Sequence, residues 1–241
     1  MPQLLVADLG RMEYAAALEL QRAVAKARIA GAIAEDVLLL LEHPPVVTMG
    51  RSSNRVHLRT SPEELAARGI ELFEAERGGE VTFHGPGQLV GYLIIDLKRH
   101  KQDLHWYLRR VEEALIRAVA PLGIAGERSA GQTGVWTQGR KLASIGVHAR
   151  DWVTWHGFAL NVTTNLSYFE VMVPCGIAGV QMTSVSAELE HRDVPAVLPN
   201  ELGAHVRRLV AQSFAEVFTL EAVSIDALAI ARLIAPTLAQ S

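Results

Sequence analysis

The 241-residue sequence lacks the features of secreted, membrane and nucleic-acid-coating proteins. Cys175 is the only cysteine, so no intrachain disulfide can form and no cysteine pair can hold structural zinc. The longest apolar runs, 37–41 and 89–95, are far shorter than the ~20 residues that cross a bilayer. The N-terminal residues lack the basic segment of a signal peptide, and the formal net charge is only -3. We therefore expect a cytoplasmic protein with no membrane and no nucleic-acid partner.

Motifs for common cofactors are absent or incomplete. The sequence has no Walker phosphate loop and no His-Glu-x-x-His zinc motif. Gly85, Gly87 and Gly91 have one residue too many in their last interval for the dinucleotide-binding pattern, and no helix is expected after them. His191-Arg192-Asp193 resembles the kinase catalytic loop, but the required asparagine and an Asp-Phe-Gly are missing. We expect no cofactor and no metal.

The apolar pattern predicts an α+β protein. Apolar residues make up 49% of the chain, which suffices for a sizeable core. Strands are predicted at 3–8, 36–42, 46–49, 70–76, 89–97, 124–128, 135–137, 141–149 and 155–162. Helices are predicted at 12–30, after 61, at 103–122, at 201–218 and over the last fifteen residues. This order favours a mixed β-sheet flanked by helices, in a single catalytic domain 1–241 with a helical C-terminal appendage at 199–241.

The helix that follows Ser61 has the clearest local signal. Ser61 occupies the N-cap position, Pro62 the first helical position, and Glu64 the third, which together form a capping box. Gly69 then ends the helix.

A glycine-rich segment at 77–97 is the first candidate site. Its first fifteen residues hold five glycines, too many for a helix, because each costs about 1 kcal/mol against alanine. Arg77, Thr82 and His84 lie between them, and an apolar strand follows. A loop that admits close backbone approach and leans on a strand is typical of binding sites. A turn that merely connects two core strands fits the same pattern.

Cys175 and Lys141 are the candidate reactive residues. A lone cysteine is more often a buried hydrophobe than a nucleophile, but Pro174 and Gly176 place Cys175 in a tight turn that can present the thiol. A thiol of pKa about 8.5 also needs a cationic neighbour to react at neutral pH. Lys141 opens a predicted strand and is the candidate neighbour, although a solvated lysine at a hairpin is the alternative. The histidines His84, His148 and His156, each taken alone, fit a hydrogen-bonded core residue better than a base.

Four sequence blocks resemble the family of octanoyl-[acyl carrier protein]:protein octanoyltransferases of protein lipoylation. They are EHPPVVTMGR (42–51), RGGEVTFHGPGQLVGY (77–92), GVWTQGRKLASIGVHARDWVTWHGFALNV (134–162) and PCGIAGVQMTSV (174–185). The resemblance covers roughly 38–189, and the alanine-rich tail after Ser224 lies outside it. It implies the fold of the catalytic domain of biotin and lipoate protein ligases.

The resemblance also implies roles and partners. Cys175 is implied as the nucleophile that accepts the acyl group, and Lys141 as the group that lowers its pKa. Octanoyl-acyl carrier protein is the implied donor, and the acceptors are lipoyl domains of 2-oxo-acid dehydrogenase complexes and the glycine cleavage H protein. Contacts with the acyl substrate are implied for Arg77, Gly78, Gly79, Glu80, Val81, Thr82, Phe83, His84, Ser144, Ile145, Gly146, Gly157, Phe158 and Ala159.

Three other functions remain open from the sequence. An ATP-dependent lipoate or biotin protein ligase shares the implied fold, but it would leave Cys175 idle. A hydrolase could use Cys175 with His84 or His148 as a base. A non-catalytic acyl-binding module would need neither Cys175 nor Lys141. For a transferase, two basic clusters could dock an acidic carrier protein: Arg51, Arg55 and Arg59, and Lys98, Arg99 and Lys101.

Overall fold

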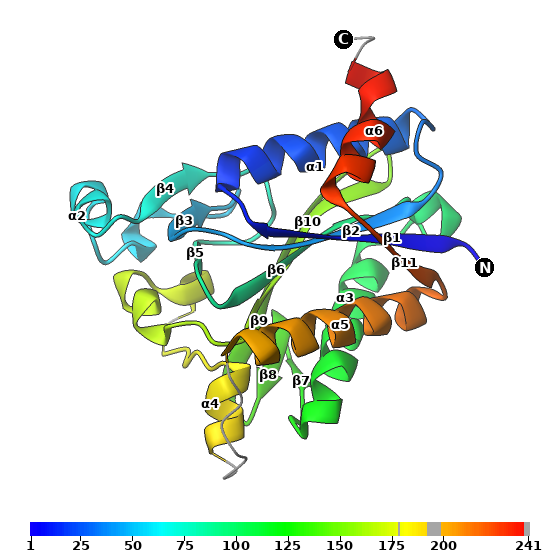
Figure 1. Cartoon of the computed structure of the whole chain (residues 1–241). Helices are drawn as coiled ribbons and strands as arrows, with labels where there is room; N and C mark the ends of the chain where they lie inside the picture. Colours follow the sequence, from blue (N-terminus) through cyan, green and yellow to red (C-terminus); the bar gives the residue numbers. More distant parts are fainter. Residues whose placement is uncertain (178, 192–198, 239–241) are drawn as a thin grey trace.

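The computed structural model describes residues 1–177, 179–191 and 199–238 (Figure 1). Its strands form one sheet in the order β11-β1-β2-β6-β10-β9-β8-β7 and a small sheet in the order β4-β3-β5. The strands are β1 (Gln3–Arg11), β2 (Asp36–Glu42), β3 (Val46–Met49), β4 (Glu71–Glu74), β5 (Thr82–His84), β6 (Gln88–Ile94), β7 (Glu127–Ser129), β8 (Gln132–Thr137), β9 (Arg140–Arg150), β10 (Val153–Asn161) and β11 (Glu221–Ile225). In the large sheet β1 runs parallel to β2 and β11, whereas the other neighbours are antiparallel. The predicted mixed sheet is confirmed.

Helices cover both faces of the large sheet. The helices of the protein are α1 (Tyr14–Ile29), α2 (Pro62–Ala67), α3 (Leu104–Val119), α4 (Val185–Glu190), α5 (Pro199–Phe218) and α6 (Ala227–Leu238), of which α2 packs on the small sheet. Figure 1 shows α1 and α6 on one side of the sheet and α3 and α5 on the other. Each side has its own apolar core, and a third core lies under the small sheet.

The central strand β2 shows why a continuous apolar run predicts a doubly covered strand. Val37, Leu39 and Leu41 belong to the core under α1 and α6. Leu38 and Leu40 belong to the core under α3 and α5. Side chains alternate between the faces of a strand, so a strand buried on both faces has no polar alternation. The bounds of β2 match the predicted strand 36–42.

The predicted capping box is present at α2. The Glu64 backbone N–H donates to Ser61 Oγ over 3.2 Å, and the Ser61 N–H donates to Glu64 Oε2 over 3.1 Å. Pro62 begins the helix. Local side-chain chemistry alone therefore determines where this helix starts.

The C-terminal segment contains a strand that the sequence pattern does not predict. β11 pairs with the edge strand β1, in parallel and in register from Gln3↔Glu221 to Ala7↔Ile225. α5 packs Val206, Val210 and Phe214 into the same core as α3. The segment expected as a helical appendage thus contributes a strand and core residues to the large sheet, while 192–198 and 239–241 lie outside the described residues.

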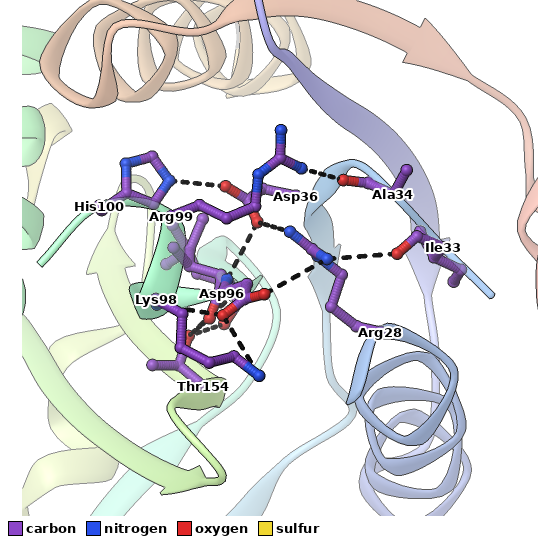
Figure 2. A network of polar contacts seen from close by, with 11 residues as sticks. Arg28, Ile33, Ala34, Asp36, Asp96, Lys98, Arg99, His100 and Thr154 are labelled. Carbon is purple, nitrogen blue, oxygen red and sulfur yellow. Dashed lines mark hydrogen bonds and ion pairs between the residues drawn. The ribbon is translucent and has the colours of Figure 1, made fainter. Parts of the chain in front are cut away.

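A buried ionic network joins the end of α1 to the sheet (Figure 2). Arg28 contacts Asp36 at 3.2 Å and Asp96 at 3.5 Å, and His100 Nε2 lies 2.7 Å from the second Asp36 oxygen. The Asp96 N–H also donates to Asp36 over 3.0 Å. Arg99 donates to the Ala34 carbonyl on the rim of this network. The network fixes α1 against the start of β2 and the chain that follows β6.

In the part of the chain that the structure describes, no helix is long and apolar enough to cross a membrane.

Candidate active site

A cavity of about 450 Å³ lies on the α1 side of the large sheet, beside the small sheet. Twelve of the residues implied as substrate contacts or catalytic groups line it: Arg77, Gly79, Glu80, Thr82, His84, Lys141, Ser144, Ile145, Gly146, Gly157, Phe158 and Ala159. Eight lining residues were not expected: Tyr14, Val90, Tyr92, Gly131, Gln132, Thr133, His156 and Ile177. Its volume falls in the range of about 300–1,000 Å³ typical of small-molecule sites.

The glycine-rich segment forms one wall because its backbone docks against β9. The Gly78 N–H donates to the Val147 carbonyl over 2.8 Å. A Cβ on Gly146 would lie 2.8 Å from the Gly78 carbonyl oxygen, closer than real Cβ contacts allow. Glycine at 146 is therefore required for the two backbones to meet.

Strand alternation divides the predicted run 77–84 between the cavity and the core. Thr82 and His84 of β5 line the cavity, whereas Val81 and Phe83 point into the apolar core under the small sheet. Gly78 is not a lining residue, and it serves the docking described above. The two-residue period of a strand accounts for this division.

Arg77 places a buried cation beside the cavity. Its Nη2 donates to the Thr48 carbonyl over 2.8 Å and to Thr48 Oγ1 over 2.7 Å. Its Nη1 donates to the Gly78 carbonyl over 3.2 Å. The guanidinium is thus anchored to β3 and to its own loop, and it contributes a fixed positive charge to the surrounding electrostatics.

The inner wall of the cavity is a cluster of neutral aromatic and imidazole rings. Tyr14 stacks on His84 with ring centroids 5.9 Å apart, and the Tyr92 and His156 rings are 6.2 Å apart. Behind these rings lies His43, which does not line the cavity: its Nδ1 donates to the Met12 carbonyl over 2.7 Å and its Nε2 accepts from the Tyr92 hydroxyl over 2.6 Å. The helix α1 begins at Tyr14, and Figure 1 shows it lying across the strands of the large sheet.

Burial dominates the titration of these rings. It lowers the pKa of His43 to about 4 and, together with the charge of Arg77, the pKa of His156 to about 3. Burial also holds the pKa of His84 well below its usual value and raises that of Tyr14 to about 12. All four side chains are therefore uncharged at neutral pH.

Lys141 lies at the other end of β9 from this cluster and is only 2% exposed. Its side chain packs over Gly134, where a Cβ would lie 3.0 Å from the lysine Cε. Its N–H donates to the Gln181 carbonyl over 2.7 Å, and its carbonyl accepts from the Thr183 N–H over 2.9 Å. Lys141 is thus bonded along its main chain to the segment that follows Cys175.

The backbone around Cys175 is anchored on both sides. Before it, the Val173 N–H donates to the His57 carbonyl over 2.7 Å, and the Arg59 N–H donates to the Val171 carbonyl over 2.9 Å. A single 3₁₀ turn, Pro174–Gly176, carries Cys175 itself. The Cys175 side chain lies outside the described part of the structure. The anchors therefore hold its turn between the 57–59 segment and the chain paired with Lys141.

Gly176 brings this turn against an imidazole–carboxylate pair. His57 Nδ1 donates to Glu80 Oε2 over 3.0 Å. A Cβ on Gly176 would lie 3.0 Å from His57 Cε1 and 3.2 Å from Glu80 Cδ, and its φ of +66° also favours glycine. The Cys175 turn therefore lies directly beside Glu80, a lining residue of the cavity.

His148 does not belong to this site. Its Nδ1 donates to the Glu76 carbonyl over 3.0 Å, its ring packs on Trp155 at 4.3 Å, and it is not a lining residue of the cavity. His84 does line the cavity, but its Nδ1 donates to Gln88 Oε1 over 2.8 Å and burial keeps its pKa low. The two histidines considered for a hydrolase thus differ in their access to the site.

Comparison with known proteins first gives the class. The fold and the cavity define a catalytic domain of the lipoate-protein ligase type: the family described as "Lipoyl protein ligase A/B catalytic domain" matches residues 13–202. The crystal structure of a lipoate-protein ligase A bound with ATP superposes with a TM-score of 0.73 over 100% of this chain and 94% of that chain, at 14% identity. At that identity the superposition establishes the fold alone.

Sequence relatives then give the family. An octanoyltransferase of Geobacter metallireducens is 52% identical over 88% of this chain and 92% of its own. An octanoyltransferase of Nostoc sp. is 46% identical over 91% of this chain and 94% of its own. The chain belongs to the octanoyltransferase family and is an acyltransferase of protein lipoylation. The resemblance found in the four sequence blocks is confirmed.

Proposed function

We propose that the protein transfers an octanoyl group from octanoyl-acyl carrier protein to a lysine of lipoyl domains through a thioester on Cys175. The acceptors are the lipoyl domains of 2-oxo-acid dehydrogenase complexes and the glycine cleavage H protein. The reaction takes place in a single catalytic domain, 1–241. A reducing cytoplasm, expected from the single cysteine, keeps the nucleophile as a thiol.

The transfer proceeds in two balanced steps. The Cys175 thiolate attacks the carbonyl of the donor thioester, a new C–S bond forms, the C–S bond of the donor breaks, and the donor leaves as a thiolate that takes up the proton held by Lys141. The ε-amine of the acceptor lysine then attacks the Cys175 thioester, an amide forms, and the Cys175 thiol is restored. The first step exchanges one thioester for another and the second converts a thioester to an amide, so neither needs ATP.

The observation that carries this proposal is the main-chain pairing of Lys141 with residues 181–183. This pairing joins the segment that follows the Cys175 turn to β9, the strand that carries Lys141 in the wall of the cavity. A lysine ammonium within about 4–6 Å favours a thiolate, typically by one to three pKa units. After giving up its proton, the same amine can accept one from the incoming lysine.

The cavity supplies the site for the acyl chain. Ile145, Phe158 and Ala159 contribute apolar wall next to Val90. The loop 77–80 and β5 close the cavity from the small-sheet side. An apolar slot with a few polar groups matches a fatty acyl chain with one thioester. Val81 and Phe83 were also expected to contact the acyl substrate. They lie in the core under the small sheet and support this wall from behind.

Intact-mass spectrometry tests the proposal. Mixing the protein with octanoyl-acyl carrier protein, without ATP or magnesium, is expected to add one octanoyl group to Cys175. Adding a lipoyl domain should then move that group to its lysine. Cys175→Ala should acquire no octanoyl mass. Strict dependence on ATP would contradict the proposal and favour a ligase, whereas release of free octanoate at the rate of transfer would favour a hydrolase.

A further inference from the structure

The second step of the proposed transfer releases one proton more than Cys175 and Lys141 can accept. A lysine amine has a pKa of about 10.4, so at neutral pH all but about one acceptor in a few thousand arrives as an ammonium. That nitrogen must lose two protons to become the nitrogen of an amide. Cys175 and Lys141 begin the cycle with one proton between them and give it to the donor, so they can take back only one. Another group must accept the second proton.

His57 lies against the Cys175 turn. A Cβ on Gly176 would lie 3.0 Å from His57 Cε1, the ring carbon between the two nitrogens. Cys175 is the preceding residue, and consecutive Cα atoms are about 3.8 Å apart. The Val173 N–H also donates to the His57 carbonyl over 2.7 Å. The imidazole is therefore held within one residue of the proposed nucleophile.

Glu80 determines which nitrogen of this ring can accept a proton. His57 Nδ1 donates to Glu80 Oε2 over 3.0 Å. An ionised carboxylate only accepts hydrogen bonds, so Nδ1 carries the hydrogen and Nε2 of the neutral ring keeps its lone pair. A carboxylate in this position also orients the ring and stabilises the imidazolium that forms when Nε2 takes up a proton.

The pair lies where the cavity meets solvent. Glu80 lines the cavity, and the side chains of His57 and Glu80 are 25% and 24% exposed. The charged residues nearest to His57 on its own segment are Arg59 and Arg55, of which Arg55 pairs with Glu74 at 3.6 Å. A proton taken up by Nε2 can therefore pass on to water, whereas Lys141 is only 2% exposed.

The more deeply buried histidines cannot accept this proton. Burial lowers the pKa of His156 to about 3 and that of His43 to about 4. It also holds the pKa of His84 well below its usual value. All three rings therefore stay neutral when an ammonium approaches at neutral pH. An imidazolium at His57 would instead keep its contacts with water and with the Glu80 carboxylate.

We propose that His57, oriented by Glu80, is the base that takes one proton from the acceptor lysine in the second step, while Lys141 takes the other. In the proposed function, on which this inference rests, that lysine attacks the Cys175 thioester. His57 Nε2 removes a proton from the ammonium, and the freed lone pair attacks the thioester carbonyl. The C–N bond forms, the C–S bond to Cys175 breaks, and Lys141 receives the proton that the nitrogen loses as the amide forms. The imidazolium then gives its proton to water.

Two-stage intact-mass kinetics test this base. Octanoyl-acyl carrier protein first loads the protein without an acceptor, and a lipoyl domain is then added. His57→Gln should load at the wild-type rate but pass the octanoyl group on about 100-fold more slowly at neutral pH, the scale of a lost acid–base group. This slow step should speed up about tenfold per unit of rising pH, because the acceptor lysine then loses its proton to solvent.

Hydroxylamine as the acceptor separates proton transfer from a structural role. It is uncharged at neutral pH and attacks a thioester without first losing a proton. The loss of the octanoyl group from Cys175 to hydroxylamine should therefore be equally fast in the wild-type protein and in His57→Gln. Glu80→Gln keeps a hydrogen-bond acceptor for the ring but removes the charge, so it should slow transfer to the lipoyl domain by a smaller factor and leave the hydroxylamine reaction unchanged.

His105→Gln is the matched control. His105 is an exposed histidine on α3, and its loss should change neither step. A wild-type second step in His57→Gln would overturn the inference. A loss of rate shared by hydroxylamine would also overturn it, because His57 would then only hold the Cys175 turn in place. If His57→Gln does not fold, Glu80→Gln decides.

The two stages also separate this inference from the proposed function. If the wild-type protein accepts no octanoyl group on Cys175, the proposed function fails, and the role of His57 fails with it. If loading and transfer are normal and His57→Gln matches the wild-type protein at every pH, the role of His57 alone fails.

Discussion

The Lys141 ammonium lies over the ring of Trp136, with Nζ 5.2 Å from the ring centroid. A cation above an indole face is held by the negative charge of the ring, more strongly when both are buried. Lys141 is 2% exposed and Trp136 is 5% exposed. The contact therefore fixes the amine at the wall of the cavity, close to the chain that follows Cys175.

Lys141→Ala should fold normally and slow octanoyl transfer about 100-fold or more, the usual scale for a lost acid–base group. The apparent pKa of iodoacetamide labelling of Cys175 should rise, because the cation that favours the thiolate is gone. Lys141→Arg keeps the charge but cannot exchange its proton, so it should retain easy labelling while transfer stays slow.

Lys101→Ala is the control for this prediction. Lys101 is an exposed lysine that pairs with Asp103 at 3.0 Å, and its loss should leave the labelling profile unchanged. Coincident pH profiles for the wild-type protein and Lys141→Ala would show that Lys141 does not tune the thiol. His84 would then become the better partner, since it also lines the cavity.

Stability should fall as the pH drops from about 6.5 toward 4. Unfolded histidines have a pKa of about 6.5, whereas burial lowers the pKa of His43 to about 4 and that of His156 to about 3. Below pH about 6.5 the unfolded chain therefore binds more protons than the folded one, and the free energy of unfolding decreases with falling pH. Above pH about 6.5 these histidines are neutral in both the folded and the unfolded chain. They then no longer make the free energy of unfolding depend on pH.

Urea denaturation at several pH values between 7 and 5 measures this effect. His43→Gln should reduce the slope by up to about 1.4 kcal/mol per pH unit, the contribution of one proton. His105→Gln, at an exposed position on α3, should leave the slope unchanged. Equal slopes in all three proteins would contradict the assignment of the effect to buried His43.

Much of the fold could be predicted because its signals are local or strongly periodic. The capping box at Ser61 and the doubly buried strand β2 each depend on a few consecutive residues. β11 could not be predicted, because it is a short, largely exposed edge strand whose partner β1 lies more than 200 residues away. The bounds of the other predicted strands differ by a few residues, as at β7, which begins at Glu127.

The candidate site shows a similar division. The glycine-rich segment and the Lys141 strand carry their own sequence signals, and both line the cavity. Tyr14 belongs to α1, which is distant in sequence from these segments, and no local sequence pattern indicates that it lines the cavity. His156 resembles an ordinary strand histidine in the sequence, and its left-handed backbone is a tertiary property. Its neighbour Gly157, which permits close approach of β6, is the nearest signal that could have drawn attention to it.

Gly146→Ala should disrupt the wall of the cavity. The added Cβ would lie 2.8 Å from the Gly78 carbonyl oxygen and 3.2 Å from Arg77 Cδ, so the loop must move away from β9. Overpacking of this kind costs about 1–3 kcal/mol. We expect a lower unfolding free energy in urea, and at least a tenfold slower formation of the acyl-enzyme in intact-mass kinetics.

Gly203→Ala provides the comparison. Gly203 lies inside α5, where its added Cβ would meet only the flexible end of Arg207 at 3.3 Å. Alanine is favoured over glycine by up to about 1 kcal/mol in a helix, so stability should not fall. If both variants behave alike, the close approach at Gly146 does not shape the cavity.

Of the two predicted docking clusters, Arg51, Arg55 and Arg59 belong to the loop whose residues 57–59 are bonded to the chain that enters the Cys175 turn. All three are exposed, and Arg55 pairs with Glu74 at 3.6 Å. In the other cluster, Lys98 pairs with Asp96 at 3.9 Å, and Arg99 donates to the Ala34 carbonyl (Figure 2). An acidic carrier protein that delivers its thioester to Cys175 should therefore be attracted by the first cluster.

Double reversal of charge, Arg51→Glu with Arg59→Glu, should raise KM for octanoyl-acyl carrier protein and lower its dependence on salt, with little change in kcat. Attraction between exposed charges is screened within about 10 Å at 0.1 M salt, so the wild-type KM should rise with ionic strength. The matched reversal, Lys98→Glu with Lys101→Glu, removes the same charge at a place where acidic partners already balance it. Its KM should change much less. Steady-state kinetics across a salt series decides the matter: equal effects from the two double variants would mean that net charge, and not the 51–59 segment, attracts the donor.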